Sequence, residues 1–245
     1  MGNIDFFNEL AAKTGSHLNS GRMFSLHRSI EKKIFKDIQR KVHFSKTDKV
    51  LDLGGGCGNI TKYLAQVCHT VVLADMAIAA LTVAKKNMKN YQNVSYDQVD
   101  MRVPLPYESD TFDHVVCYSV IHYLPTMDDV KHLFLELLRI VKPGGSILIG
   151  DIPLSEKYDA YLSERKKYPV KNFIMNQKYY LNKGILHALY KKKGVNPKQI
   201  SGMSFSRQGI EDMLKTIPSI RYAMFVQSKG LSCANSREDL VIINA

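Results

Sequence analysis

The feature that most constrains the fold is a glycine-rich turn directly after a short apolar segment. Residues 49–53 read Lys-Val-Leu-Asp-Leu, and glycines follow at positions 54, 55, 56 and 58. A short apolar run that ends at glycines predicts a buried β-strand and a tight turn. Glycine lets a ligand lie against the backbone, and N–H groups at the start of a following helix favour an anionic group such as a carboxylate.

Strand-like and helix-like segments alternate along the rest of the chain. We predict further strands at residues 70–74, 94–99, 112–118, 146–150, 221–227 and 240–244. We predict helices at residues 59–67, 77–88, 128–141 and 206–217, the third of them stopped by Lys-Pro-Gly-Gly at 142–145. This alternation predicts an α/β fold with a doubly wound, mostly parallel sheet.

Two regions lie outside the alternating pattern. In residues 1–47, Ile30, Ile34, Ile38 and Val42 recur every four residues between basic side chains, which predicts an amphipathic helix. We therefore predict an N-terminal helical cap at 1–47 and a main domain at 48–245. Within the main domain, residues 152–200 form a predicted helical insertion.

The predicted insertion carries most of the positive charge. The chain has a formal net charge of +11, and residues 152–200 contain eleven Lys or Arg and three Asp or Glu. Six of the thirteen tyrosines lie there too. Basic residues interleaved with aromatic ones suit a phosphate together with a base or a sugar ring. A solvated helical face explains the same pattern equally well.

Composition excludes several classes of protein. With 45% hydrophobic residues in 245, the chain can bury a sizeable core. No apolar run is long enough to span a bilayer, and the polar start is no signal peptide, so we predict a cytoplasmic protein without membrane insertion. The four cysteines show no zinc spacing, and we predict no metal site.

The spacing of the glycines distinguishes between the known kinds of nucleotide-binding turn. The dinucleotide pattern G-x-G-x-x-G requires a glycine at its sixth position, but Asn59 and Thr61 stand at the two candidate positions. A phosphate-binding P-loop requires a Gly-Lys pair, which the chain lacks. The observed G-x-G-x-G, two residues after an aspartate, resembles motif I of the class I methyltransferases that use S-adenosylmethionine (SAM).

Three further positions resemble that family. Asp75 ends the second predicted strand, where an acid can accept hydrogen bonds from both ribose hydroxyls. Asp100 and Met101 follow the third strand and are similar to the family's adenine site, where the acid takes the exocyclic amine. Residues 138–149, Leu-Arg-Ile-Val-Lys-Pro-Gly-Gly-Ser-Ile-Leu-Ile, resemble its helix–turn–strand unit.

The resemblance implies a seven-stranded Rossmann-like sheet with an antiparallel last strand. It also implies SAM as cofactor and S-adenosylhomocysteine (SAH) as product. The residues it marks for cofactor binding are Asp52, Gly54, Gly56, Gly58, Asp75, Met76, Asp100, Met101 and Ser119.

His122 is the candidate catalytic residue. It lies a few residues after the fourth strand, where the family's substrate pocket opens. Imidazole titrates near neutral pH, which suits a base that removes the proton of a hydroxyl group. The alternative is that His122 packs in the loop and positions Tyr123.

Residues 118–121 read Tyr-Ser-Val-Ile, which departs from the Asn/Asp-Pro-Pro-Tyr/Phe motif of enzymes that methylate adenine or glutamine amines.

These observations predict an enzyme that transfers a methyl group from SAM to a small, anionic metabolite. Residues 206–217 and 237–243 loosely resemble methyltransferases of surface-saccharide pathways, which suggests a nucleotide-linked or phosphorylated sugar. An RNA methyltransferase is the first alternative, because the basic segment could follow a phosphate backbone. A SAM-binding protein without catalysis is the second.

Overall fold

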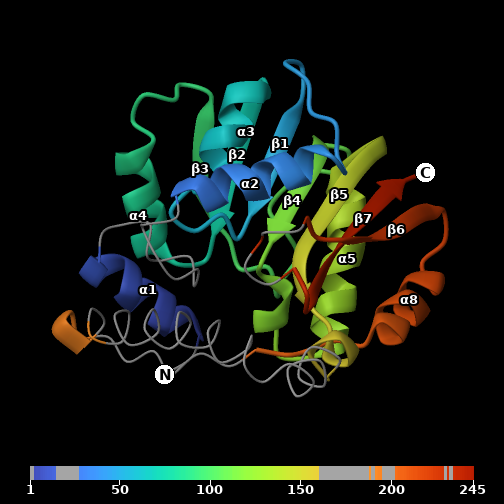
Figure 1. Ribbon diagram of the computed structural model, residues 1–245. Helices are drawn as coiled ribbons and strands as arrows, with labels where there is room; N and C mark the ends of the chain where they lie inside the picture. The colour runs from blue at the N-terminus through green and yellow to red at the C-terminus, as the bar shows by residue number, and fades with distance from the viewer. Residues whose placement is uncertain are drawn as a thin grey trace.

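A computed structural model describes residues 3–14, 28–159, 188, 191–194, 202–228, 231 and 234–245. The fold is built on one seven-stranded sheet with the order β3-β2-β1-β4-β5-β7-β6 (Figure 1). The strands are β1 (Lys49–Leu53), β2 (Thr70–Asp75), β3 (Val94–Gln98), β4 (Phe112–Tyr118), β5 (Val141–Pro153), β6 (Ile220–Val226) and β7 (Arg237–Asn244).

The pairing of the strands confirms the predicted mixed sheet. From β3 through β5 every neighbouring pair is parallel, whereas β7 runs antiparallel to both β5 and β6. The strand order reverses between β1 and β4. Strands β2 and β3 extend the sheet on one side of β1, whereas β4 and β5 extend it on the other side. In sheets of this kind a ligand binds at the carboxyl ends of the strands, at this switch point.

One face of the sheet is covered by α2 (Arg28–Gln39), α3 (Thr61–Val67) and α4 (Ile78–Asn87). Ile34 and Ile38 of α2 share a buried cluster with Leu64 of α3 and with alternate strand residues such as Val71 and Val116. The four-residue spacing that predicted an amphipathic helix therefore describes α2, although Val42 lies beyond its end and is buried in the same cluster.

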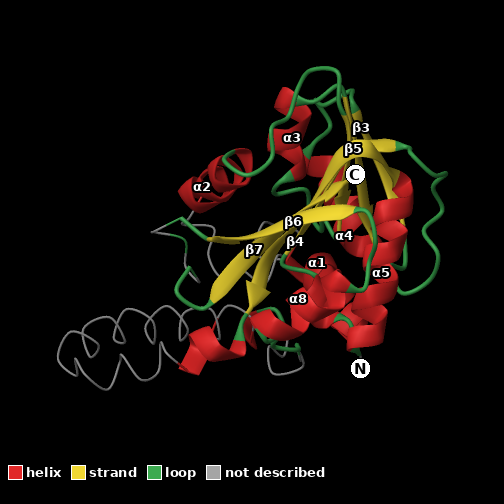
Figure 2. Cartoon of the chain, turned by 90° about the vertical axis from the view of Figure 1, so that its right-hand side faces the viewer, coloured by secondary structure: helices red, strands yellow, loops and turns green. Residues whose placement is uncertain are grey.

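The opposite face is covered by α5 (Met127–Ile140) and α8 (Arg207–Lys215), as Figure 2 shows. Val130, Leu133 and Leu137 of α5 recur at helical spacing and are buried against strand residues of the opposite parity. Thr126 begins α5 with a capping box, in which its hydroxyl accepts from the N–H of Asp129 and the Asp129 carboxylate accepts from the N–H of Thr126. The helix predicted at 128–141 is confirmed to within one residue at each end.

Helix α1 (Asn3–Thr14) packs against α4 and the glycine-rich turn rather than against a face of the sheet (Figure 1). Ala11 is buried with Cys57 of the turn and with Ala77 and Ala80 at the start of α4. The side-chain oxygen of Asn8 accepts from the N–H of Ala79 at 3.1 Å. Within the predicted N-terminal cap, α1 therefore covers the glycine-rich turn, whereas α2 belongs to a helical layer of the main fold. The division into a cap at 1–47 and a main domain at 48–245 stays a prediction.

Strand β5 is longer than the sequence predicts. The predicted strand 146–150 lies inside β5, which begins at Val141 immediately after α5 and continues through Pro153. The Lys-Pro-Gly-Gly segment stops the helix, as predicted, but it is part of the strand because Val141 already pairs with Phe112 across a register shift. Asp151 therefore lies within the strand rather than at its end.

The predicted insertion is largely outside the described residues. Ile152 and Pro153 belong to β5, and Leu154 forms an isolated bridge to Phe205 just before α8. Residues 160–187, 189–190 and 195–200, with most of the basic and tyrosine-rich stretch, are not described. No helix in the described part of the chain is long and apolar enough to cross a membrane.

Candidate functional site

The glycine-rich turn follows β1 at the switch point of the sheet. Gly54, Gly56 and Gly58 have φ angles of 74°, 56° and 83°, which disfavour any residue with a side chain. A Cβ at Gly54 would lie 2.4 Å from Cγ2 of Val120, so the turn after β1 and the loop after β4 are in close contact. The turn therefore requires glycine both for its conformation and for this approach.

Asp75 ties the end of β2 to the glycine-rich turn. Its Oδ2 accepts from the N–H of Gly56 at 2.9 Å, and its Oδ1 accepts from the N–H of Ala77 at 2.8 Å. Burial raises the pKa of this carboxyl, and hydrogen bonds from three backbone N–H groups, those of Ala77, Gly56 and Met76, offset part of that effect. Each carboxylate oxygen has a second lone pair, so Asp75 can still accept from a pair of hydroxyls.

Asp52 lies beneath the turn rather than on its ligand side. Its side chain is buried with only 1% of the residue exposed, and its Oδ2 accepts from the hydroxyl of Thr61 at 2.6 Å. Burial raises its pKa to about 7, and the neighbouring Asp75 adds to the shift. The structure thus gives Asp52 a bracing position between β1 and α3, and direct contact with a cofactor stays a prediction.

The raised pKa of Asp52 predicts a pH-dependent contribution to stability. Because the folded pKa of about 7 exceeds the ordinary value of 3.8, the fold favours the protonated carboxyl, and stability falls as pH rises through this window. Asp52→Asn keeps an oxygen for Thr61 and removes the charge. We expect its melting temperature to exceed that of the unaltered protein at pH 8 and to match it near pH 4. A lower melting temperature at pH 8 would contradict the buried, costly carboxylate.

Asp100 lies beyond the end of β3 and is bound by Arg102. The Arg102 Nε lies 2.9 Å from Oδ1 and Nη2 lies 2.7 Å from Oδ2, and the Arg102 backbone N–H donates to Oδ1 at 3.0 Å. The hydrogen bonds from the Arg102 side chain lower the pKa of this carboxyl. Arg102 Nη2 also lies 3.8 Å from the sulfur of Met76, so the structure brings together the predicted residues Asp100 and Met76.

Ser119 and His122 occupy the loop after β4. Ser119 has a φ of 65°, donates its N–H to the carbonyl of Gly150 at 2.8 Å, and donates its hydroxyl to Asp151 Oδ2 at 2.7 Å. His122 lies in the 3-10 helix η3 (Ile121–Tyr123), and 6% of the residue is exposed. Its ring centroid lies 4.1 Å from that of Tyr123, which in turn contacts Phe7 of α1 edge-on at 5.2 Å.

The comparisons with known proteins agree with this arrangement. Residues 51–149 match the family described as "Methyltransferase domain". The ubiquinone/menaquinone biosynthesis C-methyltransferase UbiE of Erwinia tasmaniensis is 31% identical over 169 residues, which is 64% of each chain. This chain therefore spans less than two thirds of that relative. Residues 51–149 therefore form a methyltransferase domain, which covers less than half of the chain.

Solved methyltransferase structures share the fold. The N-methyltransferase NodS of Bradyrhizobium japonicum, in complex with SAH, has a TM-score of 0.61 at 15% identity, covering 100% of this chain and 99% of its own. A phosphoethanolamine N-methyltransferase of Haemonchus contortus, in complex with phosphoethanolamine and SAH, has a TM-score of 0.56 at 19% identity. That match covers 62% of this chain and 32% of the Haemonchus protein.

In this methyltransferase fold the predicted residues line one edge of the sheet. From β3 to β4 the carboxyl ends carry Asp100 with Met101, Asp75 with Met76, the glycine-rich turn, and Ser119. In the described part of the chain, no group of three or more His, Cys, Asp or Glu is placed to hold a metal ion.

Several polar residues beside this edge escaped the sequence analysis. Arg102 pairs with Asp100, and Gln227, Arg237 and Asp239 surround Asp151. The signal was present in the sequence: Arg237, Glu238 and Asp239 begin a strand that is otherwise apolar. Charged residues at the start of a central strand indicate buried partners, but the pattern cannot say which residues those are.

Proposed function

We propose that the chain binds SAM along the carboxyl ends of β3, β2 and β1, and transfers its methyl group to a small acceptor beside β4 and β5. The observation that carries the proposal is the Asp75 carboxylate. It is fixed by the N–H groups of Gly56 and Ala77 at the switch point, where a ribose-binding acid belongs. When bound, SAM supplies a methyl group on a positively charged sulfur, so the leaving group is already activated.

The residues of this chain have correspondingly simple tasks. The open glycine-rich turn accommodates the cofactor's amino-acid portion, and Asp75 accepts from the ribose hydroxyls. Asp100 accepts from the adenine amine with Met101 beside the ring, either sharing its carboxylate with Arg102 or displacing that side chain. Holding acceptor and methyl in line and excluding water supplies most of the rate enhancement in such a displacement.

His122 is the proposed general base for an acceptor that must lose a proton. It stands in the loop after β4, three residues beyond Ser119, with its ring held by Tyr123. Phe7 of α1 also contacts Tyr123, so the N-terminal helix helps to fix the imidazole. An imidazole so placed can act as the general base for a hydroxyl or an amine.

The proposed acceptor is a small anionic metabolite. Lys13, in the last turn of α1, donates to the carbonyl of Gly194 at 2.8 Å, so Gly194 of the basic segment lies against the helix that packs on the glycine-rich turn. Phosphoethanolamine, the ligand of one structural neighbour, is an acceptor of this anionic kind. C-methylation of a quinol-like ring is the second candidate, because the UbiE relative is named for it.

Binding and turnover experiments test the proposal. We expect calorimetry to show binding of SAM and SAH but not of NAD, and SAH release to depend on the acceptor in a panel. The panel contains phosphoethanolamine, a nucleotide sugar, a soluble quinol and total tRNA. Binding of NAD in preference to SAM would overturn the assignment. SAH release only with tRNA, falling steeply with salt, would instead favour the RNA alternative.

A further inference from the structure

Strand β5 contains a bulge at Gly150 and Asp151. Ile149 lies opposite Leu240 of β7, whereas Ile152 lies opposite Glu238, so two residues of β5 face the single residue Asp239. Asp151 has a φ of 65° there, an uncommon conformation for a residue other than glycine. Bulges next to functional sites redirect a side chain, which raises the question of where Asp151 points.

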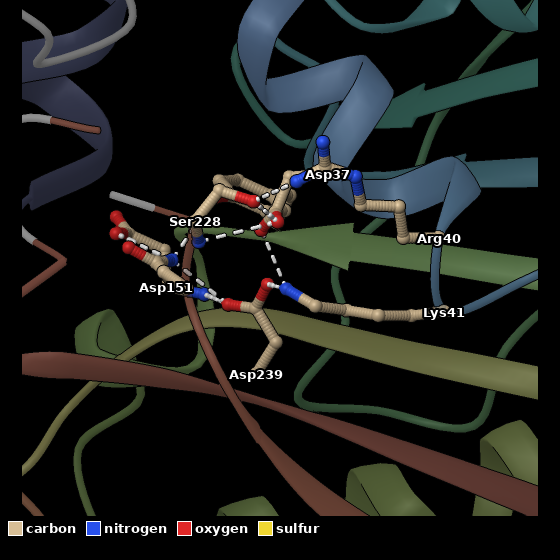
Figure 3. Close-up of polar contacts among 8 residues, drawn as sticks. Asp37, Arg40, Lys41, Asp151, Ser228 and Asp239 are labelled. Atoms are coloured by element: carbon tan, nitrogen blue, oxygen red, sulfur yellow. Dashed lines mark hydrogen bonds and ion pairs between the residues drawn. The ribbon is translucent and has the colours of Figure 1, made fainter. Parts of the chain in front are cut away.

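The bulge turns Asp151 toward the end of β4, as Figure 3 shows among its neighbours. Its Oδ2 accepts from the Ser119 hydroxyl at 2.7 Å and lies 3.2 Å from Nη1 of Arg237. A Cβ at Gly150 would lie 2.1 Å from the ring of Tyr118, so only glycine fits beside Asp151 in the bulge. The side chain is 8% exposed, and its carboxylate is thus fixed rather than solvated.

Buried residues hold the backbone of the bulge. The N–H of Asp151 donates to Asp239 Oδ1 at 2.7 Å, and the amide of Gln227 donates to the same oxygen at 2.8 Å. The other oxygen of Asp239 is bound by Lys41 at 2.6 Å. These contacts replace the strand hydrogen bond that the bulge forgoes, so the orientation of Asp151 is built into the fold.

The position of Asp151 follows from the order of the strands. The proposed adenine, ribose and amino-acid contacts of the cofactor lie at the ends of β3, β2 and β1, in that order along the edge. Val120, two residues beyond β4, lies so close to Gly54 of the turn that a Cβ added there would overlap its side chain. Gly150 of β5 pairs with Tyr118, the last residue of β4, so Asp151 comes next along this edge. It lies beyond the proposed cofactor contacts, on the side from which a methyl acceptor must approach.

We propose that Asp151 is an acceptor-binding residue that selects a hydrogen-bond-donating group, an amine or a hydroxyl. An ionised carboxylate only accepts hydrogen bonds, so it favours an N–H or O–H beside the methyl group over an anionic oxygen, which can donate none. An anionic group of the substrate must then lie away from the acceptor atom. The inference rests on the proposed function and narrows it to an N- or O-methyl acceptor.

The test uses sinefungin, the SAM analogue in which an amine-bearing carbon replaces the sulfonium and its methyl group. SAH lacks that amine, so the ratio of the two dissociation constants isolates contacts on the acceptor side. We expect the protein to bind sinefungin more tightly than SAH, and Asp151→Asn to reduce this preference by about tenfold or more while SAH affinity is unchanged. Asp113→Asn, at the opposite end of β4, is the matched control and should preserve the ratio.

A second variant guards against a folding defect in Asp151→Asn. Ser119→Ala removes the hydroxyl that orients Asp151 and should also lower the sinefungin preference, with melting temperatures recorded for all variants. An unchanged ratio in folded Asp151→Asn would overturn the inference. If that variant does not fold, an unchanged ratio in Ser119→Ala would overturn it. Failure of the unaltered protein to bind SAH would instead refute the proposed function.

Discussion

Lys41→Met is expected to lower the free energy of unfolding by about 3–5 kcal/mol, because it leaves two buried carboxylates without their cation. Lys41 Nζ lies 2.5 Å from Asp37 Oδ2 and 2.6 Å from Asp239 Oδ2 (Figure 3). The side chains of Lys41, Asp37 and Asp239 are 5%, 3% and 0% exposed, so water cannot replace the lost partner. Urea denaturation followed by circular dichroism measures the effect.

The control for this prediction is Lys215→Met. Lys215 pairs with Asp212 at 3.0 Å on α8, but both side chains are more than half exposed, so the loss should be within error. Adding Asp239→Asn to Lys41→Met removes one of the two stranded charges and should restore part of the stability. Equal stability losses for Lys41→Met and Lys215→Met would show that the buried group is not held by its lysine.

The loss from Lys41→Met should also depend on pH. Burial already raises the pKa of Asp239 even with Lys41 present, and removing the cation raises it further. A raised carboxyl pKa favours the protonated folded state, so the variant should recover stability as pH falls toward the raised value. The difference between variant and unaltered protein should therefore be largest at neutral pH and shrink in acid.

Asp75→Ala is expected to weaken SAM binding by about 1–3 kcal/mol, roughly 5- to 150-fold in Kd. The substitution removes the proposed acceptor for the ribose hydroxyls and the contacts that hold Gly56 and Ala77. Titration calorimetry with SAM provides the measurement. Asp75→Asn retains one acceptor oxygen and should lose less affinity than the alanine variant.

The same residue predicts the pH dependence of cofactor binding. Because burial raises the pKa of Asp75, SAM affinity should fall on acidification at a higher pH than for an ordinary aspartate. Asp75→Asn should remove this dependence, since its side chain does not titrate. Unchanged SAM affinity in a folded Asp75→Ala protein would show that the ribose site lies elsewhere.

The sequence by itself predicts the sheet and the glycine-rich turn because both depend on local patterns within short segments of the chain. Residues 49–53 are a continuous apolar run that ends at glycine, and β1 has those bounds. Residues 112–118 coincide with β4, and Thr126 with Asp129 gives a local start signal for α5. Alternating strands and helices imply helical crossover connections and hence a parallel sheet, whatever the side chains that fill it.

At the candidate site, the sequence likewise predicts some features, and the structure alone shows others. Spacing alone predicts glycines at 54, 56 and 58, and the structure gives each a positive φ. Strand alternation places Asp52 on the same face as Val50, under α3, where Thr61 binds it. The motif could not show that Asp52 faces inward, because it records residue types and not which side of the strand packs against a helix.

Only the tertiary structure decided the contacts that hold Asp151. Lys41 donates to Asp239, although the two residues are 198 positions apart in the sequence. The N–H of Ser228 donates to the Asp37 carboxylate across 191 positions. A buried charge needs a partner, but its local sequence does not name which one. The bulge in β5 likewise depends on the register of β7, which is set by packing across the whole sheet rather than by any pattern within residues 141–153.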